Sequence, residues 1–164
     1  MEHELVIGKY TLESLTNGMY ASPLDLYREY IQNAVDSIDA AIEEKIERAD
    51  YFEIAINLDT AKKMVSIFDN GRGLRQNDAI STLVDIGNSK KQRTQNRGFR
   101  GIGRLAGLGY CEELVFTTSF DGEDTKTSIH FDARLLKDLL MSSNENNVSV
   151  HDVMNQVISV EKAE

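Results

Sequence analysis

Cysteine, histidine and proline are scarce in this sequence of 164 residues. The single cysteine, Cys111, excludes an internal disulfide framework and cannot by itself form a zinc site. The three histidines, His3, His130 and His151, lack the spacing of metal ligands. No apolar run approaches the length of a membrane span, and residues 1–10 lack the pattern of a signal peptide. We therefore expect a cytoplasmic protein with no membrane partner.

Positive charge is also in short supply, since the formal net charge is −9. Contacts with nucleic-acid phosphates need clustered Lys and Arg, so we expect a nucleic acid to bind only through regions outside these residues. We expect the same of any client protein. One local cluster of basic residues is the exception, and we expect it to face an anion. It consists of Lys90, Lys91, Arg93, Arg97, Arg100 and Arg104.

The length and the absence of internal repeats indicate one domain over residues 1–164. Its best-marked element is a helix predicted from Ser22 to about Ala49. Ser22 is a good N-cap, the only proline, Pro23, fits the first helical position, and Asp25 adds negative charge to the first turn. The residues expected to face the core, at helical spacing, are Leu24, Tyr27, Ile31, Ala34, Val35, Ile38, Ala41 and Ile42.

Three polar residues line up on the opposite side of this predicted helix. Measured from Glu29, Asn33 lies at about 40° and Asp36 at about −20° around the helix axis. An acceptor, an amide and a second acceptor in a row can hold a polar ligand bound to a metal. Taken alone, the same pattern is more often simply a solvated helix face.

A predicted hairpin of strands 51–58 and 64–68 follows, because apolar residues alternate with polar ones on both sides of a turn. Its second strand runs directly into the sequence D-N-G-R-G, with an acid at Asp69 and glycines at Gly71 and Gly73. The glycines let the backbone come close to a ligand while the acid accepts from a donor group. An ordinary strand-to-loop turn is the alternative interpretation of this short pattern.

A second glycine-rich stretch, Gly101 to Gly109, is predicted to begin a helix directly after the basic cluster. Free N–H groups at a helix start, small residues and nearby cations together favour phosphate. The residues between, 87–100, form a long polar loop typical of a functional lid or a disordered segment. Tight helix packing and a solvated loop are the alternatives. The stretch lacks the G-K-[ST] of a P-loop and the preceding strand of a dinucleotide fingerprint.

The remaining elements are predicted from periodicity and turn residues. They are a strand at 3–7, a short helix capped by Thr11, a helix from Asn77 or Asp78 to near Gly87, strands at 111–120 and 125–131 joined by an Asp121-Gly122 turn, a helix at 133–141, and a helix with the beginning of a strand within 148–160.

In this order, E-x-x-x-N-x-x-D on a helix, D-x-G-x-G after a strand, a basic loop and a glycine-rich helix start resemble the GHKL ATPase superfamily. That superfamily comprises gyrase-type topoisomerases, the heat-shock chaperone of the ninety-kilodalton class, histidine kinases and MutL, with the related MORC proteins. The resemblance covers about residues 24–118. It implies a Bergerat fold, an α/β (α+β) two-layer sandwich whose mixed, mainly antiparallel sheet carries helices on one face.

The resemblance also implies the ligands, ATP and Mg2+, and a role for each matching residue. Glu29 corresponds to the general base that activates water, Asn33 to the amide that holds magnesium, and Asp69 to the acid that accepts from the adenine amino group. The other positions that match nucleotide-binding residues are Asp36, Gly71, Gly73, Ser89, Lys90, Gly101 and Gly103.

Two features of the superfamily are missing from these residues, a later strand with a Gly-Thr pair and a basic residue from a following domain. We therefore interpret the chain as the N-terminal ATPase piece of a longer protein, which is expected to be a homodimer that hydrolyses ATP slowly to drive conformational change. The alternatives are the catalytic domain of a histidine kinase, for which no phosphoacceptor helix is visible, and a non-catalytic interaction domain.

Overall fold

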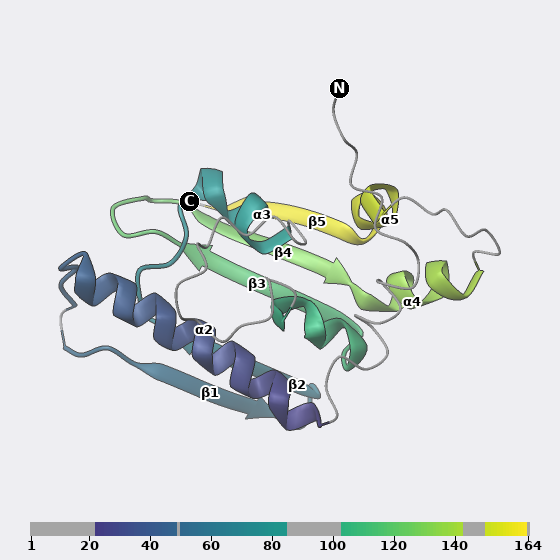
Figure 1. Cartoon of the computed structure of the whole chain (residues 1–164), viewed down its shortest axis with the longest axis horizontal. Coiled ribbons are helices and arrows are strands. Elements are labelled where there is room, and N and C mark those ends of the chain that lie inside the picture. Colours follow the sequence, from purple (N-terminus) through teal and green to yellow (C-terminus); the bar gives the residue numbers. More distant parts are fainter. Residues whose placement is uncertain (1–21, 49, 85–102, 143–149, 164) are drawn as a thin grey trace.

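The structure is a computed structural model that describes residues 22–48, 50–84, 103–142 and 150–163. The predicted strand at 3–7 and the helix capped by Thr11 lie outside these ranges. The elements in chain order are α2 (Pro23–Glu43), β1 (Ile54–Asp59), β2 (Met64–Asp69), α3 (Gln76–Val84), the 3₁₀ helix η1 (Gly103–Gly109), β3 (Glu113–Ser119), β4 (Lys126–Asp132), α4 (Ala133–Ser142), α5 (Val150–Val157) and β5 (Ile158–Ala163) (Figure 1).

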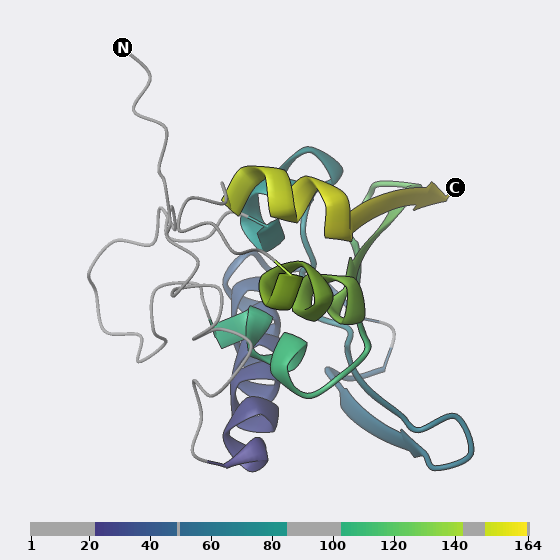
Figure 2. The same ribbon diagram turned by 90° about the vertical axis from the view of Figure 1, so that its right-hand side faces the viewer.

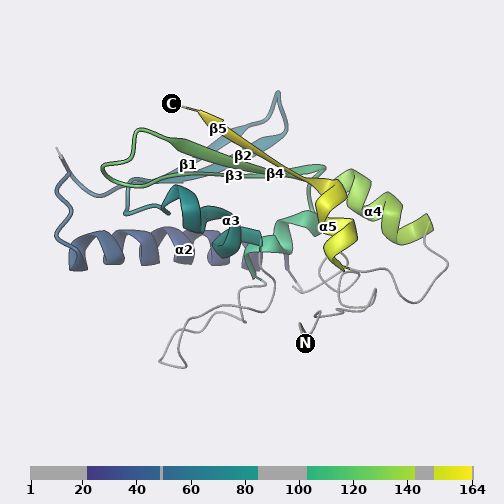
Figure 3. The same ribbon diagram turned by 90° about the horizontal axis from the view of Figure 1, so that it is seen from above.

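The described strands form two antiparallel sheets, β1-β2 and β3-β4-β5. Seen from above, α2, α3 and α5 lie on one side of the strands, as the fold prediction required (Figure 3). The β1-β2 hairpin projects away from α4 and α5 (Figure 2). The predicted two-layer α/β sandwich is therefore confirmed. β2 and β3 do not hydrogen-bond to each other, so each offers an edge to the space between the two sheets.

Both predicted hairpins are present, with strand ends that differ from the prediction by at most three residues. In the first turn the Asp59 carboxylate accepts from the backbone N–H of Lys62 at 2.9 Å, and Lys63 adopts a positive φ of 51°. In the second turn Gly122 has a φ of 82°, which glycine adopts without steric cost. In β3 and β4 more buried residues alternate with more exposed ones, whereas the apolar residues Ile56, Leu58 and Phe68 of the first hairpin are exposed.

Helix α2 begins as predicted and ends earlier than predicted. The Ser22 hydroxyl accepts from the N–H of Leu24 at 3.2 Å, which confirms the N-cap. At the other end Lys45 has a φ of 57°, and the N–H groups of Lys45 and Ile46 bond to the carbonyls of Ile42 and Ala41 at 3.0 and 2.9 Å. These bonds form a Schellman motif. It contains a lysine where glycine is usual, so the sequence carried no stop signal there.

The predicted core stripe of α2 is wrong at its two ends. Leu24 is 74% exposed and Ile42 is 55% exposed, whereas Leu26, which the stripe omitted, is 6% exposed. Ala34 and Ala41 are buried as predicted. The inward side of the helix is partly polar because it borders a cleft, so hydrophobic periodicity misjudged which side faces the strands.

The main hydrophobic core lies between the β3-β4-β5 sheet and the helices α4 and α5. Its buried members are Leu105, Leu108, Ile129, Phe131, Ala133, Leu136, Leu140, Val153, Met154 and Val157. Edge-to-face contacts continue from Phe131 through Phe116 to Tyr30 of α2, with ring centroids 6.0 and 6.2 Å apart. This aromatic chain couples α2 to the core. Within the described ranges no helix is long and apolar enough to cross a membrane.

Candidate functional site

An open cleft of about 3750 Å³ lies between α2, the end of β2, η1 and β3. Seven of the predicted site residues line it together, although they come from segments far apart in the sequence. They are Glu29, Asn33, Asp36, Asp69, Gly71, Gly73 and Gly103. The remaining predicted positions, Ser89, Lys90 and Gly101, lie outside the described residues.

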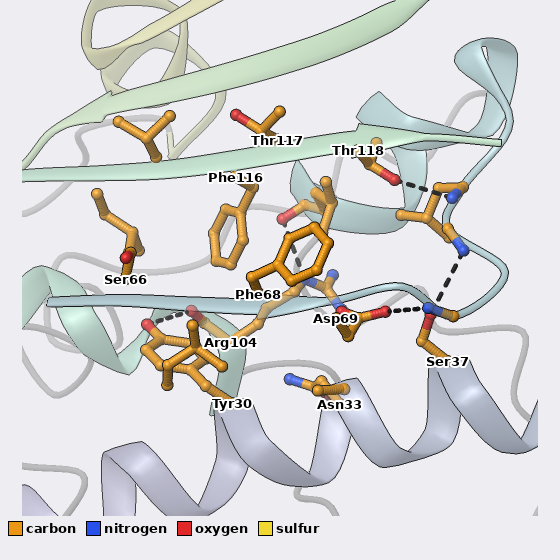
Figure 4. Close-up of a pocket in the computed structure, with 18 of the residues that line it drawn as sticks. Tyr30, Asn33, Ser37, Ser66, Phe68, Asp69, Arg104, Phe116, Thr117 and Thr118 are labelled. Carbon is orange, nitrogen blue, oxygen red and sulfur yellow. Dashed lines mark hydrogen bonds between the residues drawn. The ribbon is translucent and has the colours of Figure 1, made fainter. Parts of the chain in front are cut away.

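The carboxylate of Asp69 ends β2 and turns back onto its own loop. Its Oδ1 accepts from the backbone N–H of Gly71 at 3.0 Å, which fixes the orientation of the side chain. Within the described ranges no donor reaches Oδ2. Figure 4 shows Asn33 of α2 beneath Asp69, on the facing side of the cleft. One carboxylate oxygen therefore remains to accept a hydrogen bond from a ligand.

The two glycines of this loop are required by packing inside the protein. A Cβ on Gly71 would lie 2.4 Å from the Ser37 hydroxyl oxygen and 2.5 Å from the Ser37 carbonyl carbon. A Cβ on Gly73, where φ is 69°, would lie 1.8 Å from the carbonyl oxygen of Ser119. Because backbone atoms cannot move aside, the loop fits between α2 and β3 only without these side chains. The expectation that the glycines admit a purine remains a prediction beside this packing role.

Ser37 and Thr118 hold the loop from both sides. The Ser37 carbonyl accepts from the N–H of Arg72 at 3.0 Å, and its hydroxyl accepts from Gly73 at 3.4 Å. The Thr118 hydroxyl accepts from the N–H of Leu74 at 2.9 Å. The contacts of the Ser37 and Thr118 hydroxyls are drawn in Figure 4. They make the loop a rigid wall of the cleft.

On α2 the three predicted polar residues differ in their surroundings. Asn33 is exposed to the cleft, and Glu29 is partly exposed. Asp36 accepts from the side-chain amide of Gln32 at 2.9 Å, one turn earlier on the helix. The helical spacing that suggested a shared face therefore does bring the three residues to one cleft.

The glycine-rich stretch forms a 3₁₀ helix at residues 103–109. One of its buried glycines, Gly107, contacts α2, since the Tyr30 hydroxyl accepts from the Gly107 N–H at 3.1 Å and donates to the Arg104 carbonyl at 2.9 Å. A Cβ on Gly107 would lie 2.4 Å from that hydroxyl oxygen. At this glycine the structure shows the tight packing that was the alternative interpretation of the stretch, and the close approach explains why the residue carries no side chain.

Helix α3 begins one or two residues before either predicted cap. The Glu123 carboxylate, from the turn after β3, accepts from the N–H of Gln76 at 2.9 Å and so caps the helix from a distant part of the chain. Asp78 lies in the first turn, where its charge is favourable. Local sequence could not reveal a cap supplied across 47 positions.

Sequence reasoning missed Ser37, Thr118 and Tyr30 as parts of the site. Ser37 had a usable signal, because it follows Asn33 by four positions and therefore lies on the same side of the helix. Thr118 and Tyr30 had none, since their partners are 44 and 74 or more positions away.

The family described as "Histidine kinase-, DNA gyrase B-, and HSP90-like ATPase" matches residues 26–161. The match covers the long helix, the D-x-G-x-G loop, η1 and the second sheet.

Relatives over this region have varied names. The chain is 36% identical over 122 residues to "Chaperone protein HtpG" of Acinetobacter baylyi, which covers 63% of the chain and 19% of that protein. It is 31% identical over 135 residues to "Putative type II restriction enzyme HgiDII" of Herpetosiphon aurantiacus, covering 78% and 20%. It is 24% identical over 149 residues to "DNA mismatch repair protein MutL" of Chlorobium phaeovibrioides, covering 84% and 22%. The chain thus spans about a fifth of the length of each of these relatives.

Proposed function

Because the chain belongs to the family of histidine kinase-, DNA gyrase B- and HSP90-like ATPases, we propose that it binds Mg-ATP in the cleft beside α2 and hydrolyses it. The observation that carries the proposal is that Glu29, Asn33 and Asp69 line one cleft.

The adenine base lies at the Asp69 end of the cleft in this proposal. Oδ1 of Asp69 is held by Gly71, so Oδ2 is the oxygen that accepts from the exocyclic amino group. A site that pairs a buried acceptor with a donor on its ligand discriminates strongly against an analogue that lacks the donor.

The oxygen-bearing side chains of α2 that line the cleft suit a magnesium ion that is bound partly by the protein and partly by the nucleotide. Magnesium prefers oxygen ligands and is often bound by one or two protein groups together with phosphate oxygens. Within the described ranges no three His, Cys, Asp or Glu side chains converge on a metal position. Asn33 would therefore offer its amide oxygen while the triphosphate supplies further oxygens. The bound ion would neutralise charge that builds up on the transferring phosphoryl group.

Glu29 is the residue we assign to water activation. It lies one helical turn before Asn33, on the same side of α2, and its side chain is partly exposed in the cleft. A carboxylate at this distance from the metal-binding amide can accept a proton from a water molecule that attacks the γ-phosphate. Phosphoryl transfer otherwise depends on positioning and charge neutralisation, which the cleft walls supply.

We further propose that ATP drives conformational change in a longer, homodimeric protein. The role is chaperone-, MutL- or MORC-like in this proposal, and the relatives named as chaperone and mismatch-repair proteins support the first two. The length of those relatives supports a chain that acts together with further domains.

The test is steady-state ATP hydrolysis by the full-length protein, with Glu29→Gln as the variant and Glu43→Gln, exposed on the same helix, as its control. We expect the Glu29 variant to lose at least about 100-fold in turnover, the range found for a missing general base, while its ATP affinity stays within about threefold. Turnover equal to that of the control would contradict the assignment. Transfer of labelled phosphate to the protein, in place of its release, would favour the histidine kinase alternative.

A further inference from the structure

The Asp69–Gly73 loop has a third anchor, which comes from the segment after α2. The guanidinium of Arg48 donates through Nε to the Asn70 carbonyl at 2.7 Å and through Nη2 to the Gly71 carbonyl at 2.6 Å. The fork geometry of arginine suits two neighbouring acceptors. Its side chain is only 21% exposed, so these bonds are largely shielded from water.

The same guanidinium reaches the hairpin between β3 and β4. Its Nη1 pairs with the Asp121 carboxylate at 2.9 Å. Arg48 therefore joins the hairpin turn to the loop that carries Asp69, and all its three donor nitrogens are engaged. The Schellman motif at Lys45 explains how the chain turns back after α2 to bring Arg48 to this place.

We propose that Arg48 is a positioning residue that sets the nucleotide-base selectivity of the site. A single peptide unit of the loop connects Arg48 to the carboxylate of Asp69, which contacts the base in the proposed function. Arg48 holds the Asn70 carbonyl, and the Gly71 N–H of the same planar peptide unit holds Oδ1 of Asp69. The ligand class is a purine nucleotide with an exocyclic amino group, so the inference rests on the proposed function.

Among the described residues, Arg48 is the one anchor from outside the loop that binds the Asn70–Gly71 peptide unit, since the N–H of that unit bonds to Asp69 itself. Ser37 and Thr118 bind the N–H groups of Arg72, Gly73 and Leu74. The carbonyls of the two residues directly after Asp69 are held by Arg48. Loss of Arg48 would leave the Asn70–Gly71 peptide unit, whose N–H orients the Asp69 carboxylate, without this anchor and would loosen the orientation of Asp69.

The test compares the affinities for Mg-ATP and Mg-ITP by calorimetry, because ITP has an oxo group where ATP has the amino group. A variant that merely folds poorly loses the same fraction of binding sites for both nucleotides, so the ratio of the two affinities reports positioning alone. We expect Arg48→Ala to lower the preference for ATP by at least about fivefold, the size of a weakened hydrogen bond to a charged acceptor.

Arg48→Lys keeps the charge but loses the fork, so it should fall between the wild type and Arg48→Ala. Should Arg48→Ala fail to unfold cooperatively in urea, the lysine variant carries the test, with an expected loss of about threefold. Arg134→Ala is the control, since it removes an exposed arginine whose partner is Glu112, and its ratio should equal that of the wild type.

An Arg48 variant that keeps the wild-type ratio while both affinities fall would overturn the inference and leave the proposed function intact. A wild-type protein that binds ATP and ITP equally would instead overturn the Asp69 assignment, and the role of Arg48 with it.

Discussion

The hydroxyl of Tyr30 is the most direct polar connection between α2 and η1, so its removal should have a measurable cost. Tyr30→Phe removes two hydrogen bonds to backbone, one to the Arg104 carbonyl and one from the Gly107 N–H. The aromatic ring stays, and with it the edge-to-face contact with Phe116 at 6.2 Å. The change in stability therefore measures the hydrogen bonds of the hydroxyl without the aromatic contact.

A neutral hydrogen bond contributes about 0.5–1.5 kcal/mol, so the two together predict a loss of about 1–3 kcal/mol in the free energy of unfolding. For a protein of this size each kcal/mol lowers Tm by about 2–4 °C. Urea unfolding of Tyr30→Phe measures the loss, and Tyr51→Phe, whose residue is 66% exposed, is the matched control.

Amide hydrogen exchange gives a second, local measurement. We expect faster exchange at Gly107 in Tyr30→Phe, because its N–H loses its acceptor. A variant with wild-type stability and wild-type exchange at Gly107 would refute the reasoning.

Three further predictions concern glycines, a strained lysine and the cysteine. Lys45→Gly should raise the free energy of unfolding by about 0.5–1 kcal/mol, since glycine adopts the positive φ at the end of α2 without strain; a lower stability in urea unfolding would count against the motif. Gly73→Ala should cost about 2–5 kcal/mol because its Cβ meets the Ser119 carbonyl, whereas Gly122→Ala, in open space, should cost only about 1 kcal/mol; equal losses would contradict the packing argument. Burial raises the pKa of the Cys111 thiol, with Lys137 opposing the shift, so its alkylation at pH 8 should be slower than that of a free thiol and should keep rising above pH 9; a rate equal to that of glutathione would be contrary evidence.

The fold was predictable from the sequence wherever structure depends on local signals. The start of α2 needed only Ser22 and Pro23, and both hairpins needed only alternation and turn residues. The end of α2 was not predictable, because Lys45 adopts a conformation for which its side chain gives no indication. The start of α3 depends on Glu123, which the fold brings close only after the second hairpin has formed.

The candidate site also contains residues that local sequence indicates and residues that only long-range contacts bring to it. Glu29, Asn33 and Asp69 could be proposed from spacing and from their resemblance to known motifs, and the structure brings them to one cleft. The groups that orient them, Ser37 and Arg48, act through contacts across many positions of sequence. Such contacts are a property of the folded chain, so the spacing of Ser37 from Asn33 could indicate only a shared helix face, and no local pattern could reveal Arg48.

The central claim is that the Asp69 carboxylate accepts a hydrogen bond from the amino group of ATP. The relative affinity of Asp69→Asn for Mg-ATP and Mg-ITP is the measurement that tests it most directly. In the variant the amide oxygen takes over the bond from Gly71, so the amide NH2 replaces Oδ2 and faces the ligand. We predict that affinity for Mg-ATP falls at least about tenfold and that Mg-ITP, which offers an acceptor, binds more tightly than Mg-ATP, while Asp124→Asn, an exposed residue, keeps the wild-type preference. An Asp69→Asn protein that still binds Mg-ATP with wild-type affinity and preference would contradict the account.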